Sequence, residues 1–462
     1  MAEHNGKAIV VGGGPVGTLT AVFLGRRGFH VDLYEARSDI RSAENVSGRS
    51  INLALSVRGL SALKHGGIEE RIRSIGIPMH SRYIHTGKGS YTIPYGKKGQ
   101  YLLSTDRLEL NRQLLSVAEK SENVNLYFEH KLVNCDTRIP SATFQKAGSE
   151  ITKTGDVLIG CDGAYSAVRR QMLKGRMDFS QFYIEHGYKE LCIPPTADGE
   201  YAMPPNHLHI WPRHEYMLIA LPNLDKSFTC TLFMPFSKYE QIVTGNDVID
   251  FFNVNFNDVV PLIGDSLLRT SFFELPPLPV VTVKCSPFHH GKTALLLGDA
   301  AHAVVPFYGQ GLNAGLEDAL IFDGLVDKFG CDFEQIVPKF SEVRVKAAHA
   351  IADLSLYNYM EMRSHVATPW FLLRKKVDGF LNILFPSSFI PRYSMVTFTR
   401  IPYDQALKRA KVQDKIVDNG IIIAGGLMLT AIAFAAYKTD WKSFDLSNLT
   451  LDRVIEKAKH LW

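Results

Sequence analysis

Three glycines near the N-terminus have the spacing that allows a chain to hold the phosphates of a dinucleotide. Gly12, Gly14 and Gly17 form a G-x-G-x-x-G pattern directly after the apolar run 8–11. The first glycine permits a tight turn, the second lets a pyrophosphate approach, and the third lets a helix pack closely. Glu35 follows about twenty residues later, where a carboxylate can accept hydrogen bonds from a ribose. The spacing predicts an adenine dinucleotide without distinguishing FAD from NAD.

Two later motifs also place a carboxylate at the end of an apolar run. Asp162-Gly163 follows one such run and Gly298-Asp299 follows another. A carboxylate at the end of a buried strand can bind a hydroxyl of an extended ligand. Beyond Asp299, Pro306 and Gly309-x-Gly311 predict a loop, and a helix is expected to begin near Leu312. The free amides at that helix start would attract an electron-rich ring edge.

These motifs need a parallel sheet, because strand ends and helix starts must meet at one edge. The apolar runs 8–11 and 31–34 predict buried strands, with a helix over 18–27 between them. Asp106 is expected to cap a second amphipathic helix over 107–120. The strand-like segments 125–128 and 131–135 are expected to return the chain to the same sheet.

The middle of the chain has a different pattern. From 182 to 236, aromatic and polar residues alternate and prolines are frequent, which is typical of an antiparallel sheet with one wetter face. We interpret this region as a second domain that carries the substrate side of the site. A helix is expected over 246–255.

His302 is interpreted as a turn or packing histidine, with a catalytic base as the alternative.

Composition excludes several classes of protein. The net charge is +4, and basic and acidic residues are mixed along the chain, so no nucleic-acid partner is expected. The six cysteines are scattered without a C-x-x-C pair, which argues against a disulfide framework or a metal site.

The ordered set of glycine and acidic motifs resembles the flavin-dependent aromatic hydroxylases of the para-hydroxybenzoate hydroxylase type. The resemblance implies non-covalent FAD, NADPH as a transient co-substrate, and O₂. It also implies that the cofactor carries the reaction, so no side chain is singled out as a catalytic acid or base. The positions that would contact FAD are Gly12, Gly14, Gly17, Glu35, Ala54, Arg107, Asp162, Asp299, Leu312 and Asn313.

Four shorter stretches narrow the resemblance. Residues 48–56, 93–96, 358–363 and 391–398 are similar to the kynurenine 3-monooxygenase family in its eukaryotic form. This implies hydroxylation of L-kynurenine to 3-hydroxy-L-kynurenine through a flavin C4a-hydroperoxide. The positions that would contact this substrate are Arg82, Tyr95, Asn358, Tyr393, Glu361, Phe233, Phe307 and Met362.

Within this set, Arg82 and Tyr95 would bind the α-carboxylate and Glu361 would support the amino-acid end. The phenylalanines and Met362 would line the ring pocket and exclude water. A related flavoprotein acting on a lipid, such as an epoxidase or a prenyl reductase, is the alternative enzyme, and a flavin-binding tether is the non-enzymatic one. A carboxylate site at Arg82 does not suit a lipid.

We therefore expect an α/β protein with a Rossmann-like FAD-binding domain and an inserted antiparallel-sheet domain. The expected parts are an FAD-binding domain (1–180 and 286–340, with parts of 70–105 on the substrate side), a substrate domain (181–285), a helical region closing the substrate pocket (341–400), a basic linker (401–419), a transmembrane helix (420–437) and a short tail (438–462).

The segment 420–437 carries no charged residue, and its length is near the shortest that crosses a bilayer core. Lysines and an arginine precede it, so the catalytic part is expected to face the cytosol. A buried core helix is the alternative. The family suggests the mitochondrial outer membrane. The apolar segment 371–398 is interrupted by charges and prolines, and we expect it to pack on protein or graze a membrane.

Overall fold

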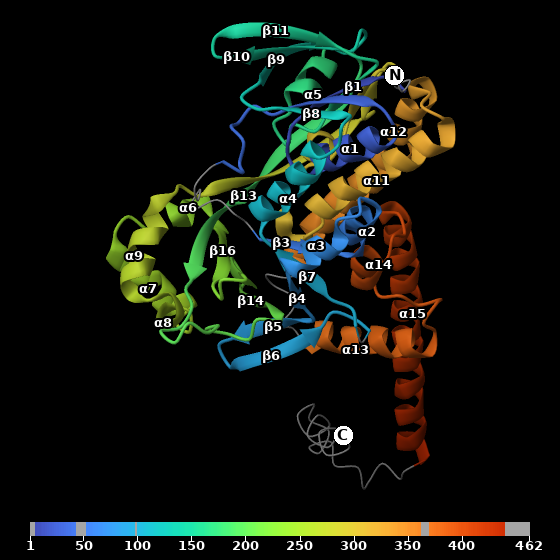
Figure 1. Cartoon of the computed structure of the whole chain (residues 1–462). Helices are drawn as coiled ribbons and strands as arrows, with labels where there is room; N and C mark the ends of the chain where they lie inside the picture. The colour runs from blue at the N-terminus through green and yellow to red at the C-terminus, as the bar shows by residue number, and fades with distance from the viewer. Residues whose placement is uncertain (1–4, 43–51, 98, 362–368, 439–462) are drawn as a thin grey trace. The chain divides into compact units, whose positions relative to one another are not determined.

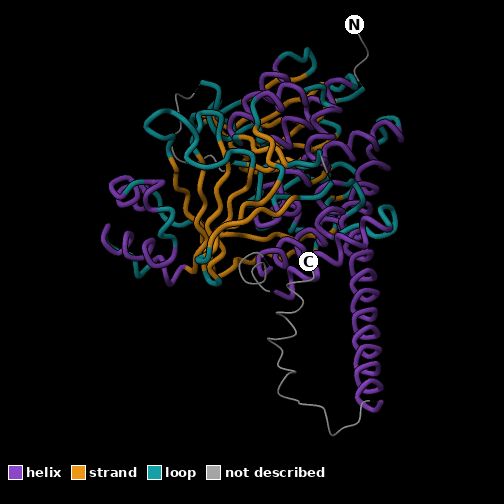
Figure 2. Tube along the Cα trace, turned by 90° about the horizontal axis from the view of Figure 1, so that it is seen from below, coloured by secondary structure: helices purple, strands orange, loops and turns teal. Residues whose placement is uncertain are grey.

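The computed structural model describes residues 5–42, 52–97, 99–361 and 369–438 (Figure 1). The chain divides into two compact units, residues 1–407 and 408–462, and each is described by itself. Two large sheets and their covering helices form the first unit, whose strands are shown together in Figure 2. The fold class is therefore the α/β class that the sequence predicted.

A six-stranded sheet carries the first glycine motif. Its order is β18 (His289–His290), β19 (Ala294–Leu296), β12 (Val157–Gly160), β1 (Lys7–Val11), β2 (His30–Tyr34) and β8 (Val124–Tyr127). The strands from β19 to β8 are parallel, and the edge strand β18 is antiparallel. Ala8, Ile9 and Val10 are fully buried, as expected of a parallel strand covered on both faces.

Helices surround this sheet and bring the motifs together. They are α1 (Pro15–Arg26), α4 (Arg107–Glu119), α5 (Ala167–Met172), α10 (Asp299–His302), the 3-10 helix η1 (Pro306–Tyr308), α11 (Gly311–Phe329) and α12 (Phe333–Met360). α11 packs against both α1 and α12, and the three helices lie side by side in Figure 1. Asp106 caps α4 as predicted, because its Oδ1 accepts a hydrogen bond from the Glu109 amide at 2.7 Å.

The prediction that residues 131–135 return the chain to the sheet of the first glycine motif is wrong. They belong to β9 (Lys131–Asp136), which pairs with β10 (Ser141–Lys146) in a separate three-stranded sheet completed by β11 (Ser149–Thr154). Ala147 and Gly148 join β10 to β11, both with positive φ, which suits a two-residue hairpin turn. The hairpin gives β9 an antiparallel partner of its own, so the strand has no need of the parallel sheet.

A seven-stranded sheet forms the other half of the first unit. Its order is β17 (Leu278–Ser286), β13 (Asp178–Ile193), β16 (Phe228–Pro235), β15 (Tyr216–Pro222), β14 (His207–Arg213), β5 (Ser81–Thr86) and β6 (Gly89–Pro94). Most neighbours are antiparallel, as predicted, but β5 pairs with β14 in parallel. The hairpin of β5 and β6 therefore adds residues from early in the chain to this sheet.

Four helices contribute to the core beside this sheet. They are α6 (Phe236–Tyr239), α7 (Gly245–Asn255), α8 (Val260–Ile263) and α9 (Asp265–Glu274). The expected helix 246–255 is confirmed as α7, which starts with a capping box between Thr244 and Asp247. The other three were not anticipated.

A small sheet connects the two large ones in sequence. It consists of β3 (Leu53–Leu55), β7 (Leu102–Thr105) and β4 (Ile77–Met79), in that order. Along the chain, the helices α2 (Val57–His65) and α3 (Glu69–Ser74) lie between β3 and β4. α2 packs against α11, which brings the end of β3 to the start of α11.

The C-terminal region is helical. α13 (Pro369–Leu384) and α14 (Arg392–Phe398) precede α15 (Tyr403–Lys438). Residues 401–419 were expected to form a linker, but from Tyr403 onward they are helix and continue into 420–437 without a break. The alanines, lysines and arginine there are good helix formers, which favours the continuity.

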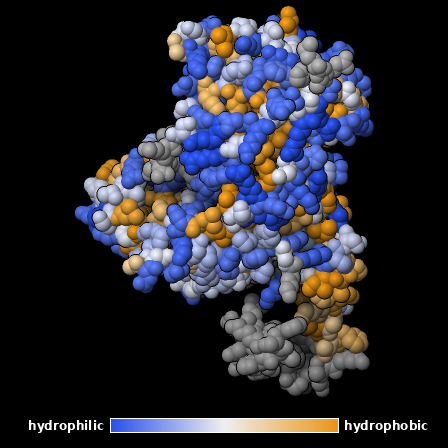
Figure 3. Space-filling view, in the orientation of Figure 1, coloured by the Kyte–Doolittle hydropathy of each residue, from blue (hydrophilic) through white to orange (hydrophobic). Residues whose placement is uncertain are grey.

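The described part of the second unit is the remainder of α15. The segment Tyr403–Ala435 is long and apolar enough to cross a membrane, and the most apolar part is only 6% buried. Figure 3 shows apolar side chains gathered on this helix. The alternative of a buried core helix does not fit this exposure. The expected tail 439–462 lies outside the described residues.

Candidate active site

The glycine turn between β1 and α1 is shaped to receive a ligand at one position. Gly12 has a φ of +107°, and a Cβ there would lie 2.4 Å from the Cys161 carbonyl oxygen. A Cβ on Gly17 would lie 2.0 Å from the Gly12 oxygen. Gly14, in contrast, has open space on its Cβ side, with nothing within 4 Å. The turn therefore packs tightly against the neighbouring strand but is open where a pyrophosphate would approach.

Glu35 is fixed to this turn. Its Oε2 accepts a hydrogen bond from the Gly13 amide at 2.8 Å, and its Oε1 accepts from the Arg37 amide and Nε. Burial alone would raise the pKa of the Glu35 carboxyl, but the hydrogen bond and charge of Arg37 outweigh it and lower the pKa. The carboxylate is thus ionised and beside the cradle. Its contact with a ribose stays a prediction.

Asn111 also holds the turn, and the sequence reasoning missed it. Its side-chain Nδ2 donates to the Gly13 carbonyl oxygen at 3.0 Å, and its buried Oδ1 has no partner among the described residues. Arg107, the predicted FAD contact, is exposed one turn earlier on α4. A buried amide among the leucines of α4 was the available signal, because buried polar groups usually serve a partner.

Asp162 has a local structural partner. Its Oδ2 accepts hydrogen bonds from the Ala167 and Val168 amides, and Oδ1 accepts from the Ser166 hydroxyl. Burial raises the pKa of this carboxyl. These contacts fix the start of α5 at the end of β12, beside Gly12. A direct contact of Asp162 with a cofactor stays a prediction.

The backbone of the Gly298-Asp299 turn is held by a hydrogen bond, whereas the Asp299 side chain is exposed. The Gly298 amide donates to Asp318 Oδ2 at 2.9 Å, and His302 Nε2 contacts the same oxygen at 2.6 Å. His302 is 1% exposed, so it packs the turn, as predicted, rather than facing a ligand. Asp299 is exposed, and no described residue pairs with its carboxylate. A ribityl chain could therefore bind it.

The start of α11 is tied to the end of β3 by one side chain. Asn313 Oδ1 accepts from the Ser56 amide at 2.8 Å, and its Nδ2 donates to the Ala54 and Gly309 carbonyl oxygens. Asn313 is therefore satisfied within the protein. The predicted contacts of Leu312, Asn313 and Ala54 with FAD would have to come from backbone or apolar atoms.

The first glycine motif, the Gly298 turn and the start of α11 meet at Val16 in the first turn of α1. A Cβ on Gly298 would lie 3.1 Å from a Val16 methyl group, and a Cβ on Gly315 would lie 2.7 Å from it. Helix α1, the Gly298 turn and α11 are thus in close contact. The open space at Gly14 and the unpaired carboxylate of Asp299 fit the two ends of an extended dinucleotide such as FAD.

Arg82 is the central residue on the substrate side. It lies on β5 and is only 6% exposed, and its guanidinium carbon is 4.3 Å from the centre of the Tyr393 ring. No described acidic residue forms an ion pair with it, and its Nε has no hydrogen-bond partner. Burial alone would lower its pKa, but Tyr393, Tyr95 and the charge of Glu361 raise it. The side chain is therefore a buried, fully charged cation with hydrogen bonds to give.

Two tyrosine rings, Tyr95 and Tyr393, lie over this guanidinium, and a third tyrosine extends the cluster. Tyr95 and Tyr308 each stack on Tyr393, with ring centres 5.8 Å and 5.6 Å apart. The Tyr95 hydroxyl is buried without a described partner, and burial raises its pKa, so it is a neutral donor. Tyr308 was not among the predicted residues, although it stands in the predicted loop. The cluster can give a carboxylate several directed hydrogen bonds.

An apolar wall adjoins this cluster. The Phe307 ring lies 4.8 Å from Phe233 and 3.8 Å from Tyr359, measured between ring centres. Asn358 Nδ2 donates to the Phe307 carbonyl oxygen at 2.7 Å, which joins α12 to η1. The predicted Phe233, Phe307 and Asn358 are thus together, and Tyr359 is an addition. Met362 lies outside the described residues.

Comparisons with known proteins agree with this geometry. The family model described as an FAD binding domain matches residues 6–323. A kynurenine 3-monooxygenase of Sus scrofa is 51% identical over 92% of this chain and 91% of its own length. The Anopheles gambiae kynurenine 3-monooxygenase is 47% identical over 93% of this chain and 89% of its own.

Solved structures support the fold alone. The chain resembles 2-methyl-3-hydroxypyridine-5-carboxylic acid oxygenase with a TM-score of 0.66 and 19% identity, over 79% of this chain and 95% of that one. PqsL of P. aeruginosa in complex with 2-aminobenzoylacetate has a TM-score of 0.64 and 17% identity, over 78% and 96% of the two chains. From the family model and the two relatives, the chain belongs to the kynurenine 3-monooxygenase family of FAD-dependent monooxygenases.

Proposed function

We propose that this protein uses NADPH and O₂ to hydroxylate L-kynurenine to 3-hydroxy-L-kynurenine, with FAD bound non-covalently. The observation that carries the proposal is Arg82, a buried guanidinium without an acidic partner among the described residues. A buried charge is costly unless it is paired. A substrate carboxylate would pair it.

The amino-acid end of L-kynurenine fits this cluster. Its carboxylate would accept hydrogen bonds from Arg82 and the Tyr95 hydroxyl, with Tyr393 stacked on the guanidinium. Glu361, whose charge acts on Arg82 and Tyr308, would attract the amino group. A lipid substrate has no such groups, so the alternative of an epoxidase or a prenyl reductase is disfavoured.

The aromatic end of the substrate would lie toward Phe233 and Phe307. These rings and Tyr359 belong to one buried apolar cluster, which would exclude water from the reacting region and fix the ring plane. When bound, FAD supplies the activation of O₂ that side chains cannot supply. We assign its ADP end to Gly12, Gly14 and Gly17.

We also assign to the cofactor the remaining predicted contacts, which are Glu35, Ala54, Arg107, Asp162, Asp299, Leu312 and Asn313. The parts 1–180 with 286–340 would form the FAD-binding domain, 181–285 the substrate domain, and 341–400 the region that closes the pocket. The hairpin of β5 and β6 supports the contribution of 70–105 to the substrate side.

The enzyme would work at a membrane surface. α15 supplies the apolar segment, and basic residues precede it, so the catalytic unit would face the cytosol. We infer the mitochondrial outer membrane as its location. Fractionation of cells that express the full chain would test this inference, and recovery in the endoplasmic reticulum would contradict it.

The function is tested by purifying the full chain in a neutral detergent and measuring bound flavin and NADPH oxidation. L-kynurenine should accelerate NADPH oxidation, and 3-hydroxy-L-kynurenine should form in proportion. A flavin-free protein, or oxidation that ignores L-kynurenine, would contradict the proposal. Peroxide release without hydroxylated product would refute the substrate assignment.

A further inference from the structure

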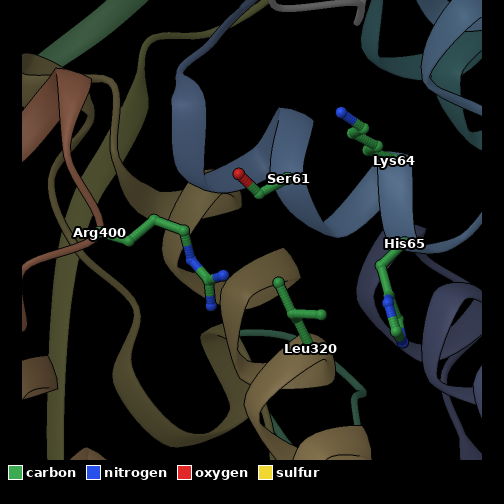
Figure 4. A pocket seen from close by; sticks show the side chains of 5 residues that line it. All are labelled: Ser61, Lys64, His65, Leu320 and Arg400. Carbon is green, nitrogen blue, oxygen red and sulfur yellow. The ribbon is translucent and has the colours of Figure 1, made fainter.

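A basic hollow lies on the surface between α2 and α11, at residues not assigned to the cofactor or the substrate. It has a volume of about 450 Å³ and is widely open to solvent. Figure 4 shows the Arg400 side chain extending toward Ser61 and Leu320, with Lys64 and His65 on the other side. The lining residues are Ser61, Lys64, His65, Leu320 and Arg400.

Arg400 carries a charge that its surroundings do not neutralise. Its nearest acid is Glu317, whose Oε1 lies 3.7 Å from the Arg400 Nε. Glu317 already accepts two hydrogen bonds from Arg58 at 2.8 and 2.9 Å and a longer one from Arg344. Arg344 also pairs with Asp318, so the two buried arginines balance the two buried acids. Arg400, whose side chain is 46% exposed, is left with excess positive charge.

The last turn of α2 adds two more basic groups. The Lys64 side chain is exposed, and no described residue pairs with its ammonium group. His65 Nε2 contacts Asp323 Oδ2 at 2.8 Å. Asp323 is already neutralised by Arg27, which contacts both of its carboxylate oxygens at 2.5 and 2.9 Å. The acid beside His65 therefore does not offset the charge of Lys64.

The end of a helix would by itself repel an anion, because its carbonyl oxygens are negative. Here Arg26 covers them: its guanidinium donates to the His65 oxygen at 3.1 Å and to the Gly66 oxygen at 2.5 Å. The hollow thus has cations on two sides, a covered helix end, and an apolar wall at Leu320. Among the described residues, no acidic side chain lines it.

We propose that this hollow binds the phosphate group of a small phosphorylated ligand. Arg400 would give a phosphate a two-point contact and Lys64 would add a movable point charge. The volume leaves room for a second phosphate or a short organic part against Leu320. The shared chemistry is a phosphate ester or diphosphate, and its source is either a soluble metabolite or a lipid headgroup.

Pyrophosphate is the probe that tests the site. The full chain is kept in neutral detergent and saturated with FAD, so that the cofactor cradle is occupied, and pyrophosphate is titrated by calorimetry at low salt. We expect saturable binding that weakens with ionic strength. Lys64→Ala and Arg400→Gln should each weaken it about tenfold, which is about 1.4 kcal/mol. Lys146→Ala, an exposed lysine on β10, is the matched control and should leave it unchanged.

Two results would overturn the proposal. One is the absence of saturable pyrophosphate binding to the unchanged chain, and the other is equal affinity in the unchanged chain, Lys64→Ala and Arg400→Gln. Once binding is shown, nanodiscs separate the sources. Competition by phosphatidic acid discs, but not by phosphatidylcholine discs, assigns a lipid headgroup, and no competition by either assigns a soluble ligand.

Discussion

Replacing Arg82 by methionine removes the buried cation and keeps an unbranched apolar stem of similar length. Methionine can still pack against the rings of Tyr393 and Tyr95, which the guanidinium now contacts. Because no described acidic residue forms an ion pair with Arg82, its loss breaks no described ion pair, although it removes a positive charge that interacts with Glu361. The substitution should therefore preserve the fold and the flavin and remove the contact with the substrate carboxylate.

The size of the effect follows from the hydrogen bonds that Arg82 can give. Two charge-assisted hydrogen bonds at about 1.5 kcal/mol each amount to about 3 kcal/mol. This predicts a roughly 150-fold rise in the Kd for L-kynurenine. Arg82→Lys keeps the charge but loses the planar fork, so it should lose about one of the two bonds, or roughly tenfold.

The assay is a titration of the FAD-loaded protein with L-kynurenine, followed by the change in flavin absorbance. An analogue of L-kynurenine that lacks the carboxyl group should bind the unchanged protein and Arg82→Met equally. Arg213→Met is the matched control on the neighbouring strand, because Arg213 donates to the Asn255 and His85 carbonyl oxygens and faces no predicted ligand. Its Kd for L-kynurenine should match that of the unchanged protein.

Two results would refute this reasoning. If Arg82→Met bound L-kynurenine with unchanged affinity, the carboxylate would lie elsewhere. If it lost FAD while still folded, Arg82 would belong to the cofactor side. A similar weakening of the analogue without its carboxyl group would show that Arg82 acts by shaping the pocket.

Three further predictions follow from the geometry. Gly12→Ala should lower the free energy of unfolding by several kcal/mol, because its Cβ would overlap a backbone oxygen. Gly14→Ala should change the free energy of unfolding by no more than about 0.5 kcal/mol and still weaken FAD binding. Equal thermal stabilities of the two variants would contradict this prediction. Burial lowers the pKa of His85 and of His209 to about 4, so the unfolded chain takes up protons first as the pH falls below about 6.5. Denaturant unfolding should then show stability falling by about 1.4 kcal/mol per pH unit for each histidine down to about pH 4, and His209→Gln should reduce that slope. Deleting 420–462 should move the protein to the soluble fraction, and a truncated chain that still pellets would point to the exposed apolar residues of α13.

The features that depend on neighbours in the chain were predictable. The glycine turn, the Asp106 cap and the helix α7 each follow from residues within a few positions, where turn and capping chemistry act. The parallel strands were also recognisable, because burial on both faces leaves a continuous apolar run. The fold class and the family followed from the order of such local signals.

The features that depend on distant partners were not predictable. Strand pairing is set by contacts between segments far apart in the chain, so the place of β9 and the parallel contact of β5 with β14 were not visible. The same holds for Asn111, which serves Gly13, and for Tyr308, which stacks on Tyr393. Their residue types are common in ordinary helices and loops.

The role of Glu35 shows a third kind of limit. Its position after β2 predicted a hydrogen-bond acceptor for a ribose, and the structure places it beside the cradle. However, the carboxylate already accepts from Gly13 and Arg37. Spacing alone predicts where a carboxylate lies but not which of its oxygens are already occupied.

The most direct test of the central claim is isotopic. The purified, FAD-loaded full chain is supplied with NADPH, L-kynurenine and ¹⁸O₂, and the product is analysed by mass spectrometry. The account predicts 3-hydroxy-L-kynurenine that carries one ¹⁸O atom on the ring. A product without ¹⁸O, or NADPH consumption that yields only labelled hydrogen peroxide, would contradict it.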